Sequence, residues 1–309
     1  MHKVPGRLGV AAIALALTAM SCGCVPDATP TNAAKCGATT TPTATYSHVV
    51  VVMEENRTWS TVGGVGFGDQ YMPFLRDLGA NCTVYSDWVE TNTSQNSLNQ
   101  YIGLASGVSN DSTVDDCSPG PTCRSTDDNI FRQVRRAGGT ARSYVEGAST
   151  GCSDAGNAAK HVPAMYFFGT YTDGSGTHND HDFCATEVRP LSEFDVDHLP
   201  TFAMITPDLC NDGHDCVNAS VDTWAAAHLQ PILDSASYAS GDTVVMVLYD
   251  EDRPVPNLIV APTAHRGVQN LAGAGHAAAL RTWEELLGLP IMGTPAVAAA
   301  PSLRASANI

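Results

Sequence analysis

Short, uninterrupted apolar runs alternate along the chain with segments whose apolar residues recur at helical spacing. The runs 49–53, 202–205 and 244–249 contain no polar position, which is typical of strands buried on both faces of a parallel sheet. Strands that alternate with helices predict an α/β fold, with a mostly parallel central sheet covered on both faces. The predicted strands are 47–53, 83–89, 141–145, 201–206, 243–249 and 257–261, and the predicted helices are 72–78, 97–106, 128–137, 221–235 and 277–287.

The N-terminal end of the chain does not share this alternation. Residues 1–24 combine a basic start with the apolar stretch 8–20, the pattern of a secretory signal, and the stretch is short for a membrane span. We expect export without an integral membrane span in the mature chain; cleavage to a soluble product and lipid attachment at Cys22 both stay open. Residues 25–45 are rich in Pro, Thr and Ala and predict a flexible tether.

The rest of the chain predicts one large domain over residues 46–293, followed by a loosely structured tail over 294–309. Two stretches inside the domain, 110–127 and 148–193, are rich in Gly, Ser and Asp and show little periodicity. We expect them to be loops over the active-site face.

The net charge of −16 narrows the range of partners. An acidic chain does not neutralise a phosphate backbone, which argues against nucleic acid or an anionic membrane surface as partner. A phosphate substrate would also be repelled, so a site for one needs bound cations.

Eight cysteines follow the signal segment, and an even number in an exported chain predicts disulfides. Two pairs are close in sequence and are expected to close small loops, and the other two pairs follow by elimination. The predicted bridges are Cys117–Cys123, Cys210–Cys216, Cys36–Cys82 and Cys152–Cys184.

Polar, mostly acidic residues follow the predicted strands at the point where each strand ends. Glu55 and Asn56 follow the run 49–53, and Asp250 and Glu251 follow a later strand. The carboxyl ends of parallel strands share one edge of a sheet, so these side chains are expected to converge. Neighbouring carboxylates repel one another unless a cation lies among them. The alternatives are a polar strand end and a surface acidic turn.

Ser97 begins a predicted helix, where the helix dipole and free N–H groups favour an anion. A neighbouring cation would lower the pKa of its hydroxyl and make it a nucleophile. The alternative is an ordinary N-cap serine, and Thr93 and Ser94 are rival nucleophiles. Together with the carboxylates, this hydroxyl predicts a metal-assisted phosphoester site.

Several histidines are further candidates. The segment 208–215 holds three carboxylates and His214, a density that fits a metal or substrate site as well as a solvated turn. His161 is a candidate anion ligand, and His276 precedes a predicted helix, with capping as the alternative. Two others, His178 and His181, flank Asp180 in a Gly-rich loop and are weak candidates for adventitious metal ligands.

Eight sequence blocks, in a fixed order, resemble the phosphoesterase family of acid phosphatases and phospholipases C, a branch of the alkaline-phosphatase-like superfamily. The resemblance extends from about residue 47 to 293 and implies a three-layer α/β/α sandwich. The blocks are HVVVVMEENRTW, SLNQYIGLASG, DNIFRQVRRAGGTARSYVEG, KHVPAMYF, LPTFAMITPDLCNDGHDC, TVVMVLYDED, VPNLIVAP and GHAAALRTWEELLGLP.

Matched residue by residue, the resemblance implies that Ser97 is the nucleophile and that His161 and His214 are further catalytic residues. Asn56 and His161 fall on positions that bind the substrate phosphate. The number and identity of the divalent metal ions are left open. The implied metal ligands are Glu55, Asn56, Asp212, Asp250, Glu251 and His276.

The expected function is that of an exported, metal-dependent phosphoesterase, acid-phosphatase-like, which acts on phosphomonoesters through a phosphoserine intermediate. The expected partner is a small phosphate ester or a phospholipid head group. A phospholipase C is the first alternative, and the chain lacks the long C-terminal region of such relatives. A catalytically inactive, exported binding protein on the same fold is the second, against which the retention of Glu55, Ser97, Asp250 and His276 argues.

Overall fold

The computed structural model describes residues 1–2, 35–64, 68–91, 96–109, 111–113, 115–148, 152 and 156–309. The chain divides into two compact units, Met1–Pro30 and Thr31–Ile309, and the first is described only at Met1 and His2. Most of the predicted signal, with Cys22, lies outside the described residues, as do Thr93 and Ser94. Across the described ranges, no helix has both the length and the apolar character needed to cross a membrane.

An eight-stranded sheet forms the centre of the second unit, in the order β10-β2-β9-β8-β1-β7-β3-β6. Strand β9 is antiparallel to both of its neighbours, and the other strand pairs are parallel. Its strands are β1 (His48–Glu54), β2 (Thr83–Trp88), β3 (Ala141–Val145), β6 (Val188–Pro190), β7 (Phe202–Thr206), β8 (Thr243–Tyr249), β9 (Val255–Val260) and β10 (Gly267–Gln269).

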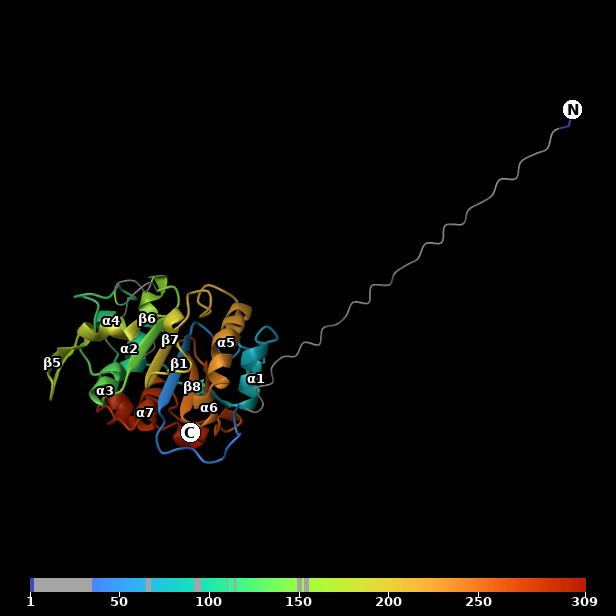
Figure 1. Ribbon diagram of the computed structural model, residues 1–309. Coiled ribbons are helices and arrows are strands. Elements are labelled where there is room, and N and C mark those ends of the chain that lie inside the picture. Colours follow the sequence, from blue (N-terminus) through green and yellow to red (C-terminus); the bar gives the residue numbers. More distant parts are fainter. Residues whose placement is uncertain are drawn as a thin grey trace. The chain divides into compact units, whose positions relative to one another are not determined.

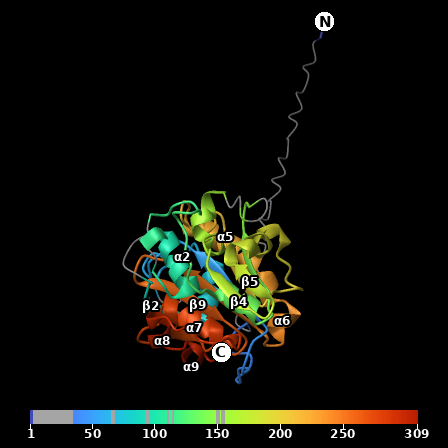
Figure 2. The ribbon, with the colours of Figure 1, turned by 90° about the vertical axis from the view of Figure 1, so that its left-hand side faces the viewer.

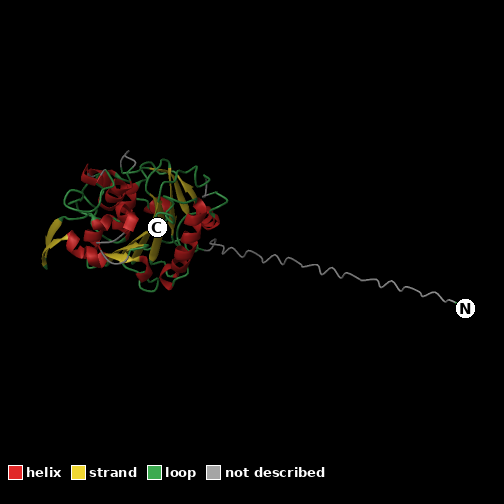
Figure 3. Ribbon diagram, turned by 90° about the horizontal axis from the view of Figure 1, so that it is seen from above, coloured by secondary structure: helices red, strands yellow, loops and turns green. Residues whose placement is uncertain are grey.

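Helices cover both faces of this sheet. On one side lie α1 (Pro73–Asn81), α5 (Asn218–Leu233) and α6 (Ala236–Ala239), as Figure 1 shows. The other side carries α2 (Ser97–Ser106), α3 (Ile130–Arg136), α4 (Cys184–Glu187) and α7 (His276–Leu286). Figure 2 shows α2 and α7 in front of the strands, and Figure 3 shows the strands between helices. The predicted three-layer α/β/α sandwich is confirmed.

Each predicted strand and helix is present, with bounds that differ by a few residues. All strand positions of β1, β7, β8 and β9 are buried except His48. This burial explains why continuous apolar runs in the sequence predicted these strands. The stretch 148–193 is more structured than expected, because it contains the antiparallel hairpin of β4 (Thr170–Asp173) and β5 (Gly176–Asn179). Both hairpin strands are polar and largely accessible, so they lack an apolar signal.

The prediction of a loosely structured tail over 294–309 is wrong. This segment contains α8 (Pro295–Ala299) and α9 (Arg304–Ala307), and it buries Leu303 and Ile309. Its Ala, Pro and Ser content resembles that of a linker, but small side chains also pack closely against a domain.

The prediction of a flexible tether over 25–45 is wrong for its described part. The Cys36–Cys82 disulfide fixes this segment to the end of α1. The Nζ of Lys35 donates to the carbonyl of Leu233 at 2.8 Å, and the guanidinium of Arg304 donates to the carbonyl of Ala44 at 2.8 Å. The folded domain therefore includes both 35–45 and 294–309, beyond the predicted limits of 46 and 293.

The four predicted disulfides are confirmed. They are Cys36–Cys82, Cys117–Cys123, Cys152–Cys184 and Cys210–Cys216.

Candidate functional site

Three carboxylates gather at the carboxyl ends of β1 and β8. These strands are parallel neighbours, and Glu54 pairs with Tyr249 at their last positions, so the residues that follow each strand emerge side by side. Glu55, Asp250 and Glu251 each offer an oxygen, and these oxygens lie within 4.8 Å of one another. The predicted convergence is confirmed, and we call these residues the three-carboxylate cluster.

The cluster is buried, which disfavours the charged carboxylates. Burial raises the pKa of Glu55 well above its ordinary value, and the neighbouring Asp250 and Asp212 raise it further. Burial likewise raises the pKa of Asp250 to about 7, and burial and then the charge of Asp250 raise that of Glu251 to about 8. Within the described part of the chain, Asp250 Oδ2 and Glu251 Oε2 have no hydrogen-bond partner. Buried, unpartnered oxygens at one point fit a hard divalent cation.

Ser97 lies against the cluster. It is the first residue of α2, after the N-cap residue Asn96, and its side chain is 2% exposed. Its Oγ donates to Glu55 Oε2 at 3.2 Å. The hydroxyl is therefore directed at a cluster carboxylate, and the interpretation of Ser97 as the N-cap residue is wrong.

Tyr101 belongs to the same site and was not predicted from the sequence. Its hydroxyl donates to Glu55 Oε1 at 2.6 Å, and its ring stacks on His161 with centroids 5.2 Å apart. It lies one helical turn after Ser97, on the same face of α2. That spacing is the signal that identifies it.

His161 lies between two carboxylates. Its Nε2 is 3.3 Å from Glu55 Oε1, and its Nδ1 is 3.2 Å from Asp212 Oδ2. Burial lowers the pKa of His161 to about 3, with Lys160 adding to the effect, so the imidazole is neutral at pH 7. A neutral ring donates through only one nitrogen. His161 can therefore donate to Glu55 or to Asp212, but not to both at once.

Asp212 is near the cluster but not part of it. Its carbonyl accepts from the Glu55 N–H at 2.8 Å, and its Oδ1 accepts from the His214 N–H at 2.7 Å. Burial raises the pKa of Asp212 to about 7. The Cys210–Cys216 disulfide closes the loop that carries it. The structure thus connects Asp212 to the cluster through the Glu55 backbone and the ring of His161.

His214 lies on the more accessible side of the site, where two further residues that were not predicted join it. The Nε2 of His214 is 3.3 Å from Lys160 Nζ, and its Nδ1 is 2.7 Å from Asp215 Oδ1. Lys160 also contacts Asp116 Oδ2 at 3.3 Å. Lys160 directly precedes His161, and Asp116 directly precedes the Cys117–Cys123 loop. These neighbouring positions are the signal in the sequence that could have identified the two residues.

Asn56 contacts the cluster, whereas His276 lies at the start of α7. Asn56 has a positive φ of 50°, and its N–H donates to Asp250 Oδ1 at 3.3 Å. It also lines a cavity of about 630 Å³ together with Tyr71 and Val217. His276 is the first residue of α7, and its Nδ1 accepts from the Thr91 N–H at 3.2 Å.

The Nε2 of His276 is buried and has no hydrogen-bond partner among the described residues. Burial lowers the pKa of His276 to about 4. The ring remains outside the three-carboxylate cluster, so the role of His276 as a metal ligand stays a prediction.

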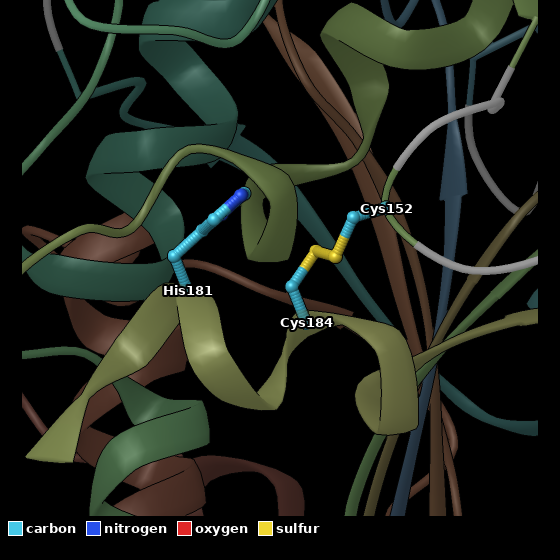
Figure 4. Close-up of side chains that lie close together, drawn as sticks. All are labelled: Cys152, His181 and Cys184. Carbon is cyan, nitrogen blue, oxygen red and sulfur yellow. A yellow bond between two sulfur atoms is a disulfide. The ribbon is translucent and has the colours of Figure 1, made fainter.

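A second group of potential metal ligands, formed by two cysteines and a histidine, does not form a metal site. His181 lies beside Cys152 and Cys184, as Figure 4 shows. Both sulfur atoms form a disulfide, so they offer no thiolate to a metal ion. The other histidine of this region, His178, pairs with Asp173 at 3.2 Å in the β4–β5 hairpin.

Comparisons with known proteins identify relatives of this chain. The model of the Phosphoesterase family matches residues 65–273. The chain is 28% identical over 263 residues to the phosphatidylinositol-3-phosphatase of Mycobacterium tuberculosis, covering 81% of this chain and 79% of that protein. It is 29% identical over 97 residues to a probable acid phosphatase of Kluyveromyces lactis, covering 30% of this chain and 21% of that protein.

Solved structures share the fold at low sequence identity. A protein of the alkaline phosphatase superfamily from Vibrio parahaemolyticus aligns with a TM-score of 0.50 and 13% identity, over 79% of this chain and 67% of that one. A 2-O GAG sulfatase aligns with a TM-score of 0.54 and 10% identity, over 85% and 74%. With the family match, these findings show that the chain belongs to the Phosphoesterase family and is a hydrolase of phosphoric ester bonds.

Proposed function

We propose that this protein is an exported, metal-dependent phosphomonoesterase that acts through a phosphoserine on Ser97. The observation that supports this most strongly is the position of the Ser97 hydroxyl. It lies at the start of α2 and donates to Glu55, a member of a buried cluster of three carboxylates. Ser97 follows the N-cap residue Asn96, so capping the helix does not account for its hydroxyl.

The donor set of the cluster supports a metal requirement. A divalent cation held by Glu55, Asp250 and Glu251 would offset their charges, lower the pKa of the Ser97 hydroxyl and neutralise the oxygens of the ester. The buried, unpartnered oxygens of Asp250 and Glu251 favour such an ion.

In this proposal, Ser97 attacks phosphorus in line with the leaving oxygen. The N-terminus of α2 favours the negative charge that builds up on its oxygen and on the phosphoryl group. A bond forms between Ser97 Oγ and phosphorus while the bond between phosphorus and the leaving oxygen breaks. Water then hydrolyses the phosphoserine, which releases inorganic phosphate and restores the hydroxyl.

The surrounding side chains position Glu55, protonate the leaving group and bind the phosphoryl oxygens. Tyr101 and His161 hold Glu55 in position through the contacts described above. His214 is 29% exposed, and at this more accessible side it is suited to protonating the leaving oxygen. Asn56 contacts Asp250 through its backbone N–H and lines the 630 Å³ cavity, so its amide is suited to donating to a phosphoryl oxygen.

The compartment and the substrate are further parts of the proposal. Four disulfides are consistent with an extracellular protein, and the basic and apolar start of the chain favours export. The similarity to a phosphatidylinositol-3-phosphatase makes a phosphorylated lipid head group a candidate substrate beside small soluble monoesters.

A substrate panel with and without a chelator tests this function. The mature chain is assayed on p-nitrophenyl phosphate, on vesicles with phosphatidylinositol 3-phosphate, and on phosphatidylcholine vesicles. We expect chelator-sensitive release of phosphate from the monoesters. Cleavage of phosphatidylcholine in preference to both would instead establish a phospholipase C, and inactivity on the whole panel with every divalent cation tried would refute the proposal.

The nucleophile is located separately. The enzyme is quenched with acid during turnover, and the phosphorylated residue is identified by mass spectrometry. Phosphate on Ser97 is the expected result, whereas phosphate on Thr93 or Ser94 would move the nucleophile and keep the mechanism.

A further inference from the structure

An internal carboxylate lies where an anion would bind next to the nucleophile. Asp116 Oδ1 accepts from the N–H of Leu98 at 3.0 Å, and Leu98 is the residue directly after Ser97 at the N-terminus of α2. Free N–H groups at this end of a helix, together with its dipole, attract anions. The Asp116 carboxylate therefore occupies a backbone donor of the residue next to Ser97.

The second oxygen of Asp116 faces a cation. Lys160 Nζ is 3.3 Å from Asp116 Oδ2 and 3.3 Å from His214 Nε2. The charge of Asp116 also raises the pKa of Glu251 and that of His161. These effects place the carboxylate within electrostatic reach of the three-carboxylate cluster and of the neutral imidazole beside it.

We propose that Lys160 and the Leu98 N–H bind the phosphoryl group, and that Asp116 occupies this position until the substrate displaces it. The proposal rests on the function proposed above and adds a phosphate ligand and a competitor for it. Both side chains are accessible to solvent, with 21% of Lys160 and 25% of Asp116 exposed, so displacement needs no opening of the core.

The competition also bears on the class of substrate. A phosphomonoester offers three terminal oxygens and nearly two negative charges at neutral pH, while a diester offers two such oxygens and one charge. The dianion compensates better for the lost contact between Asp116 and Lys160. Asp116 therefore selects for monoesters over diesters.

Binding of inorganic phosphate, measured by calorimetry with the divalent cation present, tests the proposal directly. Asp116→Asn should tighten binding about five-fold, because a like charge about 4 Å away in a watery environment costs roughly that factor. Asparagine keeps an oxygen acceptor for Leu98 and tolerates the left-handed backbone of position 116, where φ is 51°. The matched control is Asp115→Asn, an exposed acid one residue away, which should leave the affinity nearly unchanged.

Lys160 variants complete the test. Lys160→Met should weaken phosphate binding about ten-fold, the usual scale for a lost charge-assisted hydrogen bond, and Lys160→Arg should restore most of it. In the Lys160→Met background, Asp116→Asn should still tighten binding, because the charge of Asp116 and its bond to the Leu98 N–H remain there. The monoester-to-diester ratio of kcat/KM should fall in Asp116→Asn.

Weaker or unchanged phosphate binding in Asp116→Asn would overturn the inference and make Asp116 a helix cap or a positioning residue for Lys160. An equal gain from Asp115→Asn would reduce the effect to general charge repulsion and would also overturn it. In either case an active wild-type enzyme leaves the proposed function standing. Absence of both hydrolysis and phosphate binding in the wild type would refute the proposed function itself.

Discussion

Replacing Ser97 with alanine separates a catalytic hydroxyl from a structural one, because the two roles predict effects of different size. In the described part of the chain, the Oγ donates to Glu55 at 3.2 Å, and Glu55 keeps the Tyr101 hydroxyl as a second donor at 2.6 Å. Losing one such bond costs about 1 kcal/mol of unfolding free energy. For a large domain this lowers the Tm by about 2–4 °C.

The effect on turnover should be far larger if Ser97 is the nucleophile. No other group replaces the attacking oxygen in Ser97→Ala, while the three-carboxylate cluster stays intact and would still hold a metal ion. We expect kcat to fall by about 10⁴-fold or more, since each factor of ten corresponds to about 1.4 kcal/mol of activation free energy. The increase in activation free energy thus exceeds the decrease in unfolding free energy by several kcal/mol.

Ser106→Ala is the matched control. Ser106 is also a buried serine of α2, and its Oγ donates to the Ile102 carbonyl at 2.7 Å, away from the cluster. Its replacement should lower the Tm by a similar amount and leave kcat on p-nitrophenyl phosphate unchanged. If Ser97→Ala keeps more than about one hundredth of the wild-type kcat, with a Tm like that of the control, the nucleophile assignment is wrong.

Three further predictions follow from the same site. Because burial raises the pKa values of the cluster acids above their unfolded values of about 4, the chelated folded state binds more protons than the unfolded state from about pH 4 to pH 8. The stability contributed by these acids is therefore present at low pH and is lost as the pH rises through this window. The Tm in EDTA should fall from pH 5 to pH 8, and added cation should raise the Tm more at pH 8 than at pH 5. An equal rise of the Tm at both pH values would contradict a metal site. Tyr101→Phe keeps the ring but removes the donor to Glu55, so kcat should fall about ten-fold with little change in Tm; wild-type turnover would exclude a positioning role. Replacing Cys210 and Cys216 by serine opens a short loop and should cost about 2–3 kcal/mol in urea unfolding, with a loss of kcat as Asp212 becomes less ordered; unchanged kcat would show that the loop does not position the site.

The convergence of the cluster was predictable because it depends only on strand direction. Buried parallel strands are marked by their continuous apolar runs, and the residues after such strands share one edge of the sheet whatever the strand order. Glu55 and Asp250 met this condition. The neighbouring position of β1 and β8 in the sheet was not needed for the prediction, although it sets the distance between their acids.

The rest of the site was not predictable in the same way, because it depends on segments without periodicity. Asp116 lies in the stretch 110–127, and Lys160 lies in 148–193. Their contact joins two irregular segments 44 residues apart along the chain, and no local pattern determines where such segments meet. The same limit explains the tail, whose position depends on distant residues, since Arg304 donates to the carbonyls of Thr43 and Ala44.

The structure distinguishes Glu54 from Glu55, two neighbouring acids that the sequence motif alone does not separate. Consecutive residues at the end of a strand point to opposite faces of a sheet, so only one of the two can join the cluster. Glu55 faces Tyr101 of α2, whereas the pKa of Glu54 is raised by burial and then by Asp212, with a further contribution from Asp222 of α5. Since α2 and α5 lie on opposite sides of the sheet (Figure 1), the pleat of β1 directs Glu55 to the nucleophile. An exchange of roles would require a one-residue shift of β1 against β8, which would also turn the buried valines of β1 to the opposite faces of the sheet.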